Sequence, residues 1–106
     1  MIVRIWRGQA EPSRADAYHR HVTERVFPEL TNISGHRGAY LLRRAAGDRV
    51  EFLAVTLWDS LETVRKFAGD DPDVAVVEPE AQAVLSEYDD FVRHFDLVHA
   101  SGCALP

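Results

Sequence analysis

Hydrophobic and polar residues alternate along several stretches of the chain, and the stretches between them follow a helical period. Residues 2 to 7 predict a first strand, because they are rich in β-branched and aromatic residues. Residues 37 to 45 and 49 to 58 predict two further strands, joined by a Gly-Asp turn into an antiparallel hairpin. Residues 91 to 99 predict the last strand.

Helices are expected between these strands. Ser13 is expected to open the first helix, with Asp16 at the capping-box position, and Pro28 is expected to break or kink it. Asp59 is expected to cap a second helix that stops at Gly69. The elements then follow in the order β-α-β-β-α-β.

The stretch before the last strand carries further helical signals. Residues 73 to 77 are compatible with one helical turn, and Pro79 fits the first position of a short helix through about Leu85. Together the elements predict a single α+β domain over residues 1 to 100, with the ferredoxin-like arrangement and an antiparallel sheet. Residues 101 to 106 are expected to form a loose tail.

The predicted third strand is apolar on both faces. One face carries Val50, Phe52, Ala54, Thr56 and Trp58, and the other carries Leu53, Val55 and Leu57. The last strand is similar, with Phe91, Phe95 and Leu97 on one side and Val92, His94 and Val98 on the other. Helices can cover only one face of the sheet, and monomers rarely expose a large apolar patch. The pattern therefore predicts a homodimer packed sheet against sheet, with a monomer that exposes this face as the alternative.

Composition and charge narrow the classes of partner. The chain has 106 residues and a formal net charge of -5, which argues against nucleic acid and anionic membrane surfaces because both bind basic patches. The one cysteine, Cys103, cannot form an internal disulfide. With no signal peptide or membrane span predicted, we expect a cytoplasmic protein.

Histidines supply the candidate proton-transfer groups. No pair has the spacing of a zinc site such as His-Glu-x-x-His, so no metal is expected. Tyr18 and His21 lie three residues apart on the first predicted helix, where phenol and imidazole can touch. The alternative is an ordinary surface histidine. His94, inside an apolar stretch of the last strand, is either a base at the floor of a pocket or a structural residue with a hydrogen-bond partner.

Two tryptophans, Trp6 and Trp58, lie on predicted strands. Together with Phe52, their flat side chains suit the walls of a pocket for an aromatic ligand. The alternative is that these side chains simply fill the core.

An ordered series of motifs resembles the antibiotic biosynthesis monooxygenase-like family over residues 1 to about 98. The series consists of MIVRIWRG, Ala15-x-x-Tyr18-x-x-His21, Pro28-Glu29-Leu30, Gly35-x-x-Gly38-x-Tyr40-Leu41-Leu42-Arg43-Arg44, Glu51-Phe52, Thr56-Leu57-Trp58-Asp59-Ser60-Leu61, Phe67-Ala68-Gly69 and Val92-x-His94-Phe95. The resemblance implies a dimeric α/β barrel.

The superfamily that the chain resembles includes cofactor-free oxygenases of aromatic polyketides, haem-degrading enzymes, and small isomerases and cyclases. In the cofactor-free oxygenases the substrate donates the electrons to oxygen, so the protein needs only to bind a flat phenol, deprotonate it and exclude water. By analogy, His94 or His21 would be the base and Tyr18 its hydrogen-bond partner. Trp6 and Trp58 would be the pocket walls.

Haem degradation is disfavoured within this resemblance. Its members share the tryptophan at Trp58, but their haem-ligating histidine falls near Val77, and this chain has no histidine between His36 and His94. The asparagine that they carry on the first strand is also absent.

The expected function is therefore a cofactor-independent monooxygenase that acts on an aromatic or quinol-like small molecule. One alternative is a non-catalytic dimer with a ligand-binding or structural role. Another is an isomerase or cyclase that uses the same base without oxygen.

Overall fold

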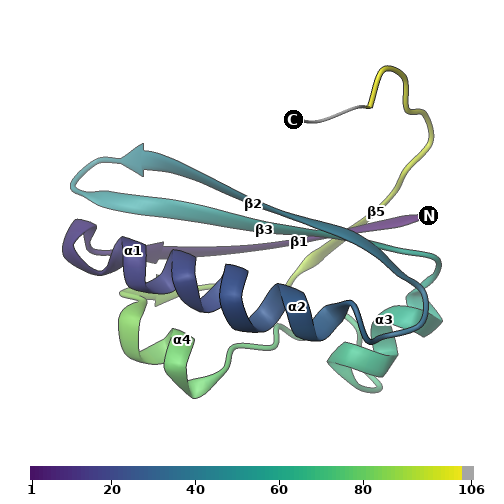
Figure 1. The fold of residues 1–106 in the computed structure, drawn as a ribbon, viewed down its shortest axis with the longest axis horizontal. Helices are drawn as coiled ribbons and strands as arrows, with labels where there is room; N and C mark the ends of the chain where they lie inside the picture. The colour runs from purple at the N-terminus through teal and green to yellow at the C-terminus, as the bar shows by residue number, and fades with distance from the viewer. Residues whose placement is uncertain (104–106) are drawn as a thin grey trace.

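Over residues 1–103, which the computed structural model describes, the chain forms one antiparallel sheet with its helices on one side (Figure 1). The strands are β1 Ile2–Ala10, β2 His36–Ala46, β3 Arg49–Trp58, β4 Glu87–Tyr88 and β5 Arg93–Asp96. The order across the sheet is β2-β3-β1, and β4 and β5 both pair with the free edge of β1. This topology confirms the predicted α+β, ferredoxin-like class.

The first helical segment is longer than predicted and does not break at Pro28. It consists of α1 Pro12–His21, a π-helical segment Val22–Val26 and α2 Phe27–Leu30. Within it, the backbone N–H of Phe27 donates to the carbonyl of Val22, five residues back. Pro28 then falls in the first turn of α2, directly after the wider π-helical segment. The segment continues as helix through Pro28, so a break, one of the two expected outcomes, was wrong.

Two predicted helix caps were also wrong. The residue before α1 is Glu11, whose side chain makes no capping bond, so Ser13 does not open the helix. For α3 Leu61–Ala68 the cap is Ser60, which forms a capping box with Thr63 in place of the expected Asp59. The predicted end of α3 at Gly69 is confirmed, with φ of +91°.

The last strand is shorter than the predicted range 91 to 99. The backbone before β5 is engaged elsewhere, because the N–H of Val92 donates to the carbonyl of Asp73 at 2.8 Å. Phe91 likewise forms an isolated bridge with Val74, so no helical turn forms at 73 to 77. The helix expected at Pro79 is present as α4 Pro79–Val84.

Residues 101 to 103, where a loose tail was expected, are exposed and lie outside helices and strands. Residues 104–106 lie outside the described part of the chain. No helix within residues 1–103 is long and apolar enough to cross a membrane.

The covered face of the sheet packs against the helices in two core clusters. One contains Ala10, Ala15, Tyr18, Val22, Phe52, Ala81 and Leu85. The other contains Leu30, Trp58 and Val64. Alternation along β3 places Phe52, Thr56 and Trp58 on this covered face, as the sequence predicted.

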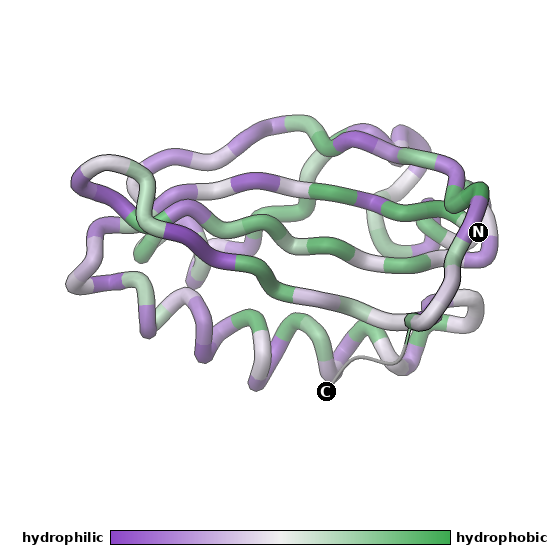
Figure 2. The backbone as a smooth tube through the Cα atoms, turned by 90° about the horizontal axis from the view of Figure 1, so that it is seen from above, coloured by the Kyte–Doolittle hydropathy of each residue, from purple (hydrophilic) through white to green (hydrophobic). Residues whose placement is uncertain are grey.

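The opposite face of the sheet carries no helix (Figure 1). The strand register brings together on this uncovered face Val3, Ile5, Tyr40, Leu42, Leu53, Val55, Leu57 and Phe95. Leu42 and Phe95 are 50% and 51% exposed. Figure 2 shows green hydrophobic stretches on neighbouring strands, with polar residues near the turn that joins β2 to β3. An apolar face of this kind is what the sequence predicted for the third strand.

Candidate functional site

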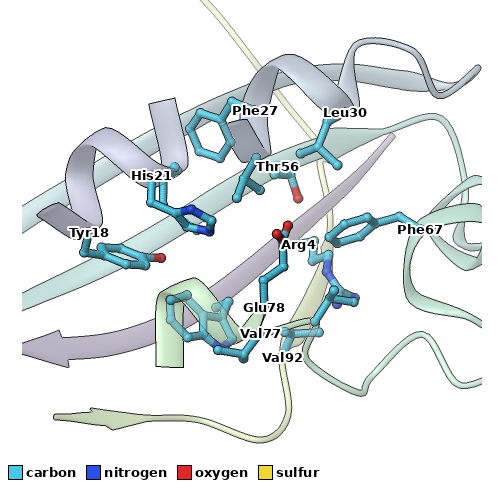
Figure 3. A pocket seen from close by; sticks show the side chains of 16 residues that line it. Arg4, Tyr18, His21, Phe27, Leu30, Thr56, Phe67, Val77, Glu78 and Val92 are labelled. Atoms are coloured by element: carbon cyan, nitrogen blue, oxygen red, sulfur yellow. The ribbon is translucent and has the colours of Figure 1, made fainter. Parts of the chain in front are cut away.

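A cavity lies between the covered face of the sheet, the helical segment above it and the loop before α4 (Figure 3). Its cavity volume is about 70 Å³, and the cavity is partly open to solvent. Sixteen residues line it, and most of them are apolar. A mostly apolar lining with a few polar groups is typical of a site for a small organic molecule.

One wall of the cavity is aromatic. The indole of Trp6 projects from β1 and lies 6.1 Å from the ring of Tyr18, measured between centroids. Gly8 makes room for it, because a Cβ at Gly8 would lie only 2.5 Å from the Trp6 ring. The indole N–H donates to the carbonyl of Asp89 at 3.0 Å, which fixes the ring while leaving it in the cavity wall.

Tyr18 and His21 both line the cavity from α1, as their spacing of three residues allows. Tyr18 is only 3% exposed, and burial raises the pKa of its phenol well above the usual value, so the hydroxyl stays protonated at neutral pH. The Nε2 atom of His21 is buried without a hydrogen-bond partner among the described residues. A buried imidazole nitrogen of this kind is free to interact with a ligand.

The cavity also contains a cation, Arg4, that sequence analysis missed. Arg4 is 4% exposed and lies on the covered face of β1, two residues before Trp6. Its guanidinium donates to the carbonyls of Pro72 and Val74, the latter at 3.0 Å, and lies 5.7 Å above the ring of Phe67. Burial is the main cause that lowers its pKa to about 10, so it remains charged at neutral pH.

His94 lies behind Arg4 and does not line the cavity. Its Nε2 is 3.1 Å from Nη1 of Arg4, and since arginine can only donate, Nε2 is the acceptor. Nδ1 therefore carries the proton and donates to Asp73 Oδ1 at 3.0 Å. Burial is the first cause that lowers the pKa of His94, which favours this neutral form. The geometry thus makes His94 a support for Arg4 and places it away from the pocket floor that sequence analysis suggested.

Glu78 is a second polar residue that sequence analysis missed. It occupies the N-cap position of α4, but its side chain makes no capping bond and lines the cavity (Figure 3). The Pro79 that follows was a sequence signal for this helix start, although it did not indicate where the carboxylate would point. For Arg4 the available signal was alternation, which gave it the same face as Trp6.

The other two expected pocket residues lie outside the lining. Trp58 is fully buried in the second core cluster, where its indole N–H donates to the hydroxyl of Thr56 at 2.8 Å. Phe52 is also fully buried, and its ring packs edge-on against Tyr18 with centroids 4.8 Å apart. Phe52 therefore supports the cavity wall from behind, through Tyr18. Within residues 1–103, no three His, Cys, Asp or Glu side chains come together as a metal site requires.

Comparisons with known proteins agree with this fold. Residues 1–72 match the family model described as antibiotic biosynthesis monooxygenase. No match was found among curated proteins. The heme-degrader MhuD from Mycobacterium tuberculosis, with two hemes bound in its active site, has a TM-score of 0.65 and 22% identity, and the match covers 96% of this chain and 100% of that one. The monooxygenase ActVA-Orf6 from Streptomyces coelicolor, in complex with nanaomycin D, has a TM-score of 0.63 and 16% identity over 99% and 91% of the two chains. At these identities the two structures support the fold alone.

Proposed function

Because this chain belongs to the antibiotic biosynthesis monooxygenase family, we propose that it oxidises an aromatic or quinol-like small molecule in the cavity, without a metal or organic cofactor. The observation that carries this proposal is His21. Its buried Nε2, which has no hydrogen-bond partner within residues 1–103, faces a cavity whose wall is formed by the rings of Trp6 and Tyr18. An imidazole in apolar surroundings beside a flat binding wall suits deprotonation of a phenol or of an acidic ring carbon.

The chemistry asked of the protein is limited to binding, proton transfer and exclusion of water. For an anthrone-type substrate, His21 takes a proton from the methylene carbon, and the resulting anion donates electrons to dioxygen. One oxygen atom becomes the new ring carbonyl, and the other leaves as water with the two hydrogens that the carbon loses. The four electrons that reduce dioxygen therefore come from the substrate, so the reaction balances without a further reductant.

Tyr18 would act as a hydrogen-bond donor in this scheme. Its raised pKa keeps the phenol protonated, so it can donate to an oxygen of the substrate or of the reduced dioxygen. Phe52 would hold the Tyr18 ring in place from behind, and Trp58 would contribute by packing. His94 would act through Arg4.

A homodimer is the second part of the proposal. The apolar uncovered face of the sheet, which includes Leu42 at 50% exposure and Phe95 at 51% exposure, supports two copies packed sheet against sheet. The uncovered face also carries Glu51 between Arg7 and Arg44, with both distances at 2.7 Å. These satisfied charges can lie at the rim of such an interface without leaving an unpaired ion.

Haem, which MhuD binds, fits this cavity poorly. Haem carries two propionates, and the lining offers only one cation, Arg4, together with the carboxylate of Glu78. Val77, near which the resemblance places the haem-ligating histidine of the haem-degrading members, lines the cavity and cannot ligate haem. We therefore assign no step to haem.

An isomerase is the second candidate, and the observation that favours it is the presence of both His21 and Glu78 in one cavity. A base and a second proton carrier can move a proton between two atoms of a bound ligand without oxygen. Oxygen uptake separates this activity from the oxygenase.

The experiment is oxygen consumption by metal-free protein over a panel of anthrones, naphthols and quinols. We expect uptake with at least one compound, and a loss of about 100-fold or more in His21→Gln, as is typical when a general base is removed. His19→Gln is the matched control, because His19 lies on the same helix but is exposed. Uptake that is equal in His21→Gln and the unmodified protein would overturn the assignment of His21. Isomerised product without oxygen uptake would favour the second candidate.

A further inference from the structure

The segment that joins α3 to α4, residues 69–78, forms part of the cavity wall, and we call it the strap. It has no helix or strand of its own, and Val76, Val77 and Glu78 line the cavity from it (Figure 3). No residue within 69–78 is fully buried, and Val74 and Val76 are 40% and 42% exposed. A segment that buries so little apolar surface opens at a lower cost in free energy than the core. The strap is therefore a part of the wall that can open without unfolding the core.

Arg4 holds the strap closed. It lies on β1 and is 4% exposed, and its guanidinium donates to the strap carbonyls of Pro72 and Val74. The ring of Phe67, from α3, lies 5.7 Å from the guanidinium and supports it from another side. Arg4 thus acts as a latch that connects the sheet to the strap across the edge of the cavity.

His94 lies behind this latch and contacts the strap as well. Its Nε2 accepts from Nη1 of Arg4 at 3.1 Å, and its Nδ1 donates to Oδ1 of Asp73, a strap residue, at 3.0 Å. The carboxylate therefore balances the charge of Arg4 through the imidazole. This arrangement requires a neutral His94, because an imidazolium has no nitrogen left to accept a hydrogen bond.

Protonation of His94 would set two cations against each other. The N–H that forms at Nε2 would face Nη1 of Arg4, which can only donate. Within residues 1–103, the charged groups that face His94 are Arg4 from β1 and Asp73 from the strap. Asp73 attracts an imidazolium and opposes release, but burial is the largest influence and, together with Arg4, lowers the pKa of His94. The closed strap therefore disfavours the proton.

We propose that the strap is a pH-sensitive lid over the cavity, which Arg4 latches and which opens when His94 takes up a proton. With the strap open, His94 is in contact with water and binds a proton more readily than with the strap closed. Opening therefore becomes more frequent as the pH falls below about 6.5, the ordinary pKa of histidine, and does not respond to this group at higher pH. The inference is independent of the proposed reaction, because a lid controls the entry of any ligand.

Amide hydrogen exchange of the full chain without ligand tests the lid. Two amides join the strap to the segment before β5: Ala75 donates to the carbonyl of Asp90 at 2.9 Å, and Val92 donates to that of Asp73 at 2.8 Å. Their protection, relative to an unstructured chain at the same pH, should fall by up to about tenfold between about pH 7.5 and 5.5, because one proton accompanies opening. The amide of Asp89, which donates to β1 at 3.0 Å, is the control and should keep its protection.

Three variants assign the response to its group. His94→Gln removes the titrating side chain, so the protection of the two strap amides should no longer vary with pH. His36→Gln is the matched control, because the pKa of His36 is also lowered by burial but its ring lies against Trp58. In that variant the response should persist. Asp73→Asn removes the charge that opposes release and should leave the response at least as large.

Access to the cavity is measured with a buried thiol. Val22→Cys places the thiol in the lining, where Val22 is 3% exposed, and Cys103→Ser removes the native one. We expect the thiol to react with a maleimide faster as the pH falls from about 7.5 to 5.5, relative to a cysteine peptide at the same pH. His94→Gln in the same background should abolish this trend.

Four results would overturn the inference. They are strap amides whose protection does not change with pH, an equal change at Asp89, which would indicate unfolding of the whole chain, and a relative thiol rate that stays constant. The fourth is a response lost in Asp73→Asn, which would assign it to that carboxylate. None of these results depends on oxygen uptake, so the lid and the oxygenase stand or fall separately.

Discussion

The covered side of the sheet has a filled end and a hollow end, and each is built around a tryptophan. At the filled end, Trp58 is fully buried between His36 and Phe67, with ring centroids 5.0 and 6.0 Å away. At the hollow end, Trp6 is half-buried and forms part of the cavity wall. The two residues occupy the same covered face and differ in what lies above them.

The element above each tryptophan explains the difference. Helix α3 covers the filled end and contributes Val64, which is fully buried. Over the hollow end the chain from Gly69 to Glu78 forms no helix, and Arg4 holds it through the carbonyls of Pro72 and Val74. A cation that binds a loop fills less space than a helix with apolar side chains, so a cavity remains. The same residue type therefore becomes core at one end and binding wall at the other.

The largest expected effect comes from replacing each of the two tryptophans with alanine. Trp58→Ala should lower the free energy of unfolding by about 3 to 5 kcal/mol, because it opens a cavity in a closed core. Trp6→Ala should cost roughly half as much or less, since one side of its ring already faces empty space, and it should weaken ligand binding instead. Urea denaturation measures both costs. Equal losses of stability would mean that the two ends are packed alike.

The next effect concerns the uncovered face of the sheet. Leu53→Glu places a charge in the middle of this face, and we expect the proposed homodimer to dissociate, with the dissociation constant raised about 100-fold or more. Leu61→Glu is the matched control, because Leu61 is 37% exposed on α3, on the covered side. Sedimentation measures the assembly of both variants. A Leu53→Glu variant that sediments like the unmodified protein would show that the face carries no partner copy.

A smaller effect compares the caps of the helices at the two ends. Ser60→Ala removes the capping box of α3 at the filled end and should cost about 1 kcal/mol in unfolding free energy. Ser13→Ala should cost close to nothing, because Ser13 makes no capping bond to α1. Urea denaturation at matched protein concentration separates the two. A similar cost for both variants would contradict the cap assignment.

The sequence predicted features that repeat along a strand better than features that depend on a single residue. The alternation of residues correctly assigned the faces of β3. The pattern repeats over the ten residues of the strand, so one atypical residue does not change the assignment. The caps at Ser13 and Asp59 were wrong because each depends on the geometry of one residue. Asp59 instead pairs with Arg37 at 2.6 Å, a partner from another strand that local sequence does not reveal.

The candidate site was predicted in part. The spacing of Tyr18 and His21 indicated that both would lie on one helical face, and both line the cavity. Trp58 and His94 could not be placed from the sequence, since their surroundings depend on α3 and on Arg4. Glu78 was missed because a loop residue has no periodic pattern that indicates its direction.

The smallest effect uses one histidine from each end. Burial is the first cause that lowers the pKa of both His36, at the filled end, and His94, behind the hollow one. Because the pKa of each histidine is lower in the folded chain, the unfolded chain takes up the proton first as the pH falls. This uptake begins near the ordinary histidine pKa of 6.5. The stability is therefore complete above about pH 6.5 and falls as the pH decreases toward the folded-state values. Paired carboxylates such as Glu51, whose pKa is lowered by Arg44 and Arg7, add stability that is complete above their ordinary pKa of 4.5 and is lost only as the pH falls below it, so they do not affect the slope at higher pH.

His36→Gln and His94→Gln should each make the unfolding free energy less dependent on pH between about 6.5 and 5, as measured by urea denaturation at several pH values. His19→Gln, at an exposed position, should leave this slope unchanged. The two variants should differ in binding. His94→Gln removes a contact that holds Arg4 and should weaken ligand binding in the cavity. His36 lies against Trp58 instead, so His36→Gln should leave ligand binding unchanged. If both variants weaken binding equally, the filled and hollow ends respond as one unit and the division between them fails.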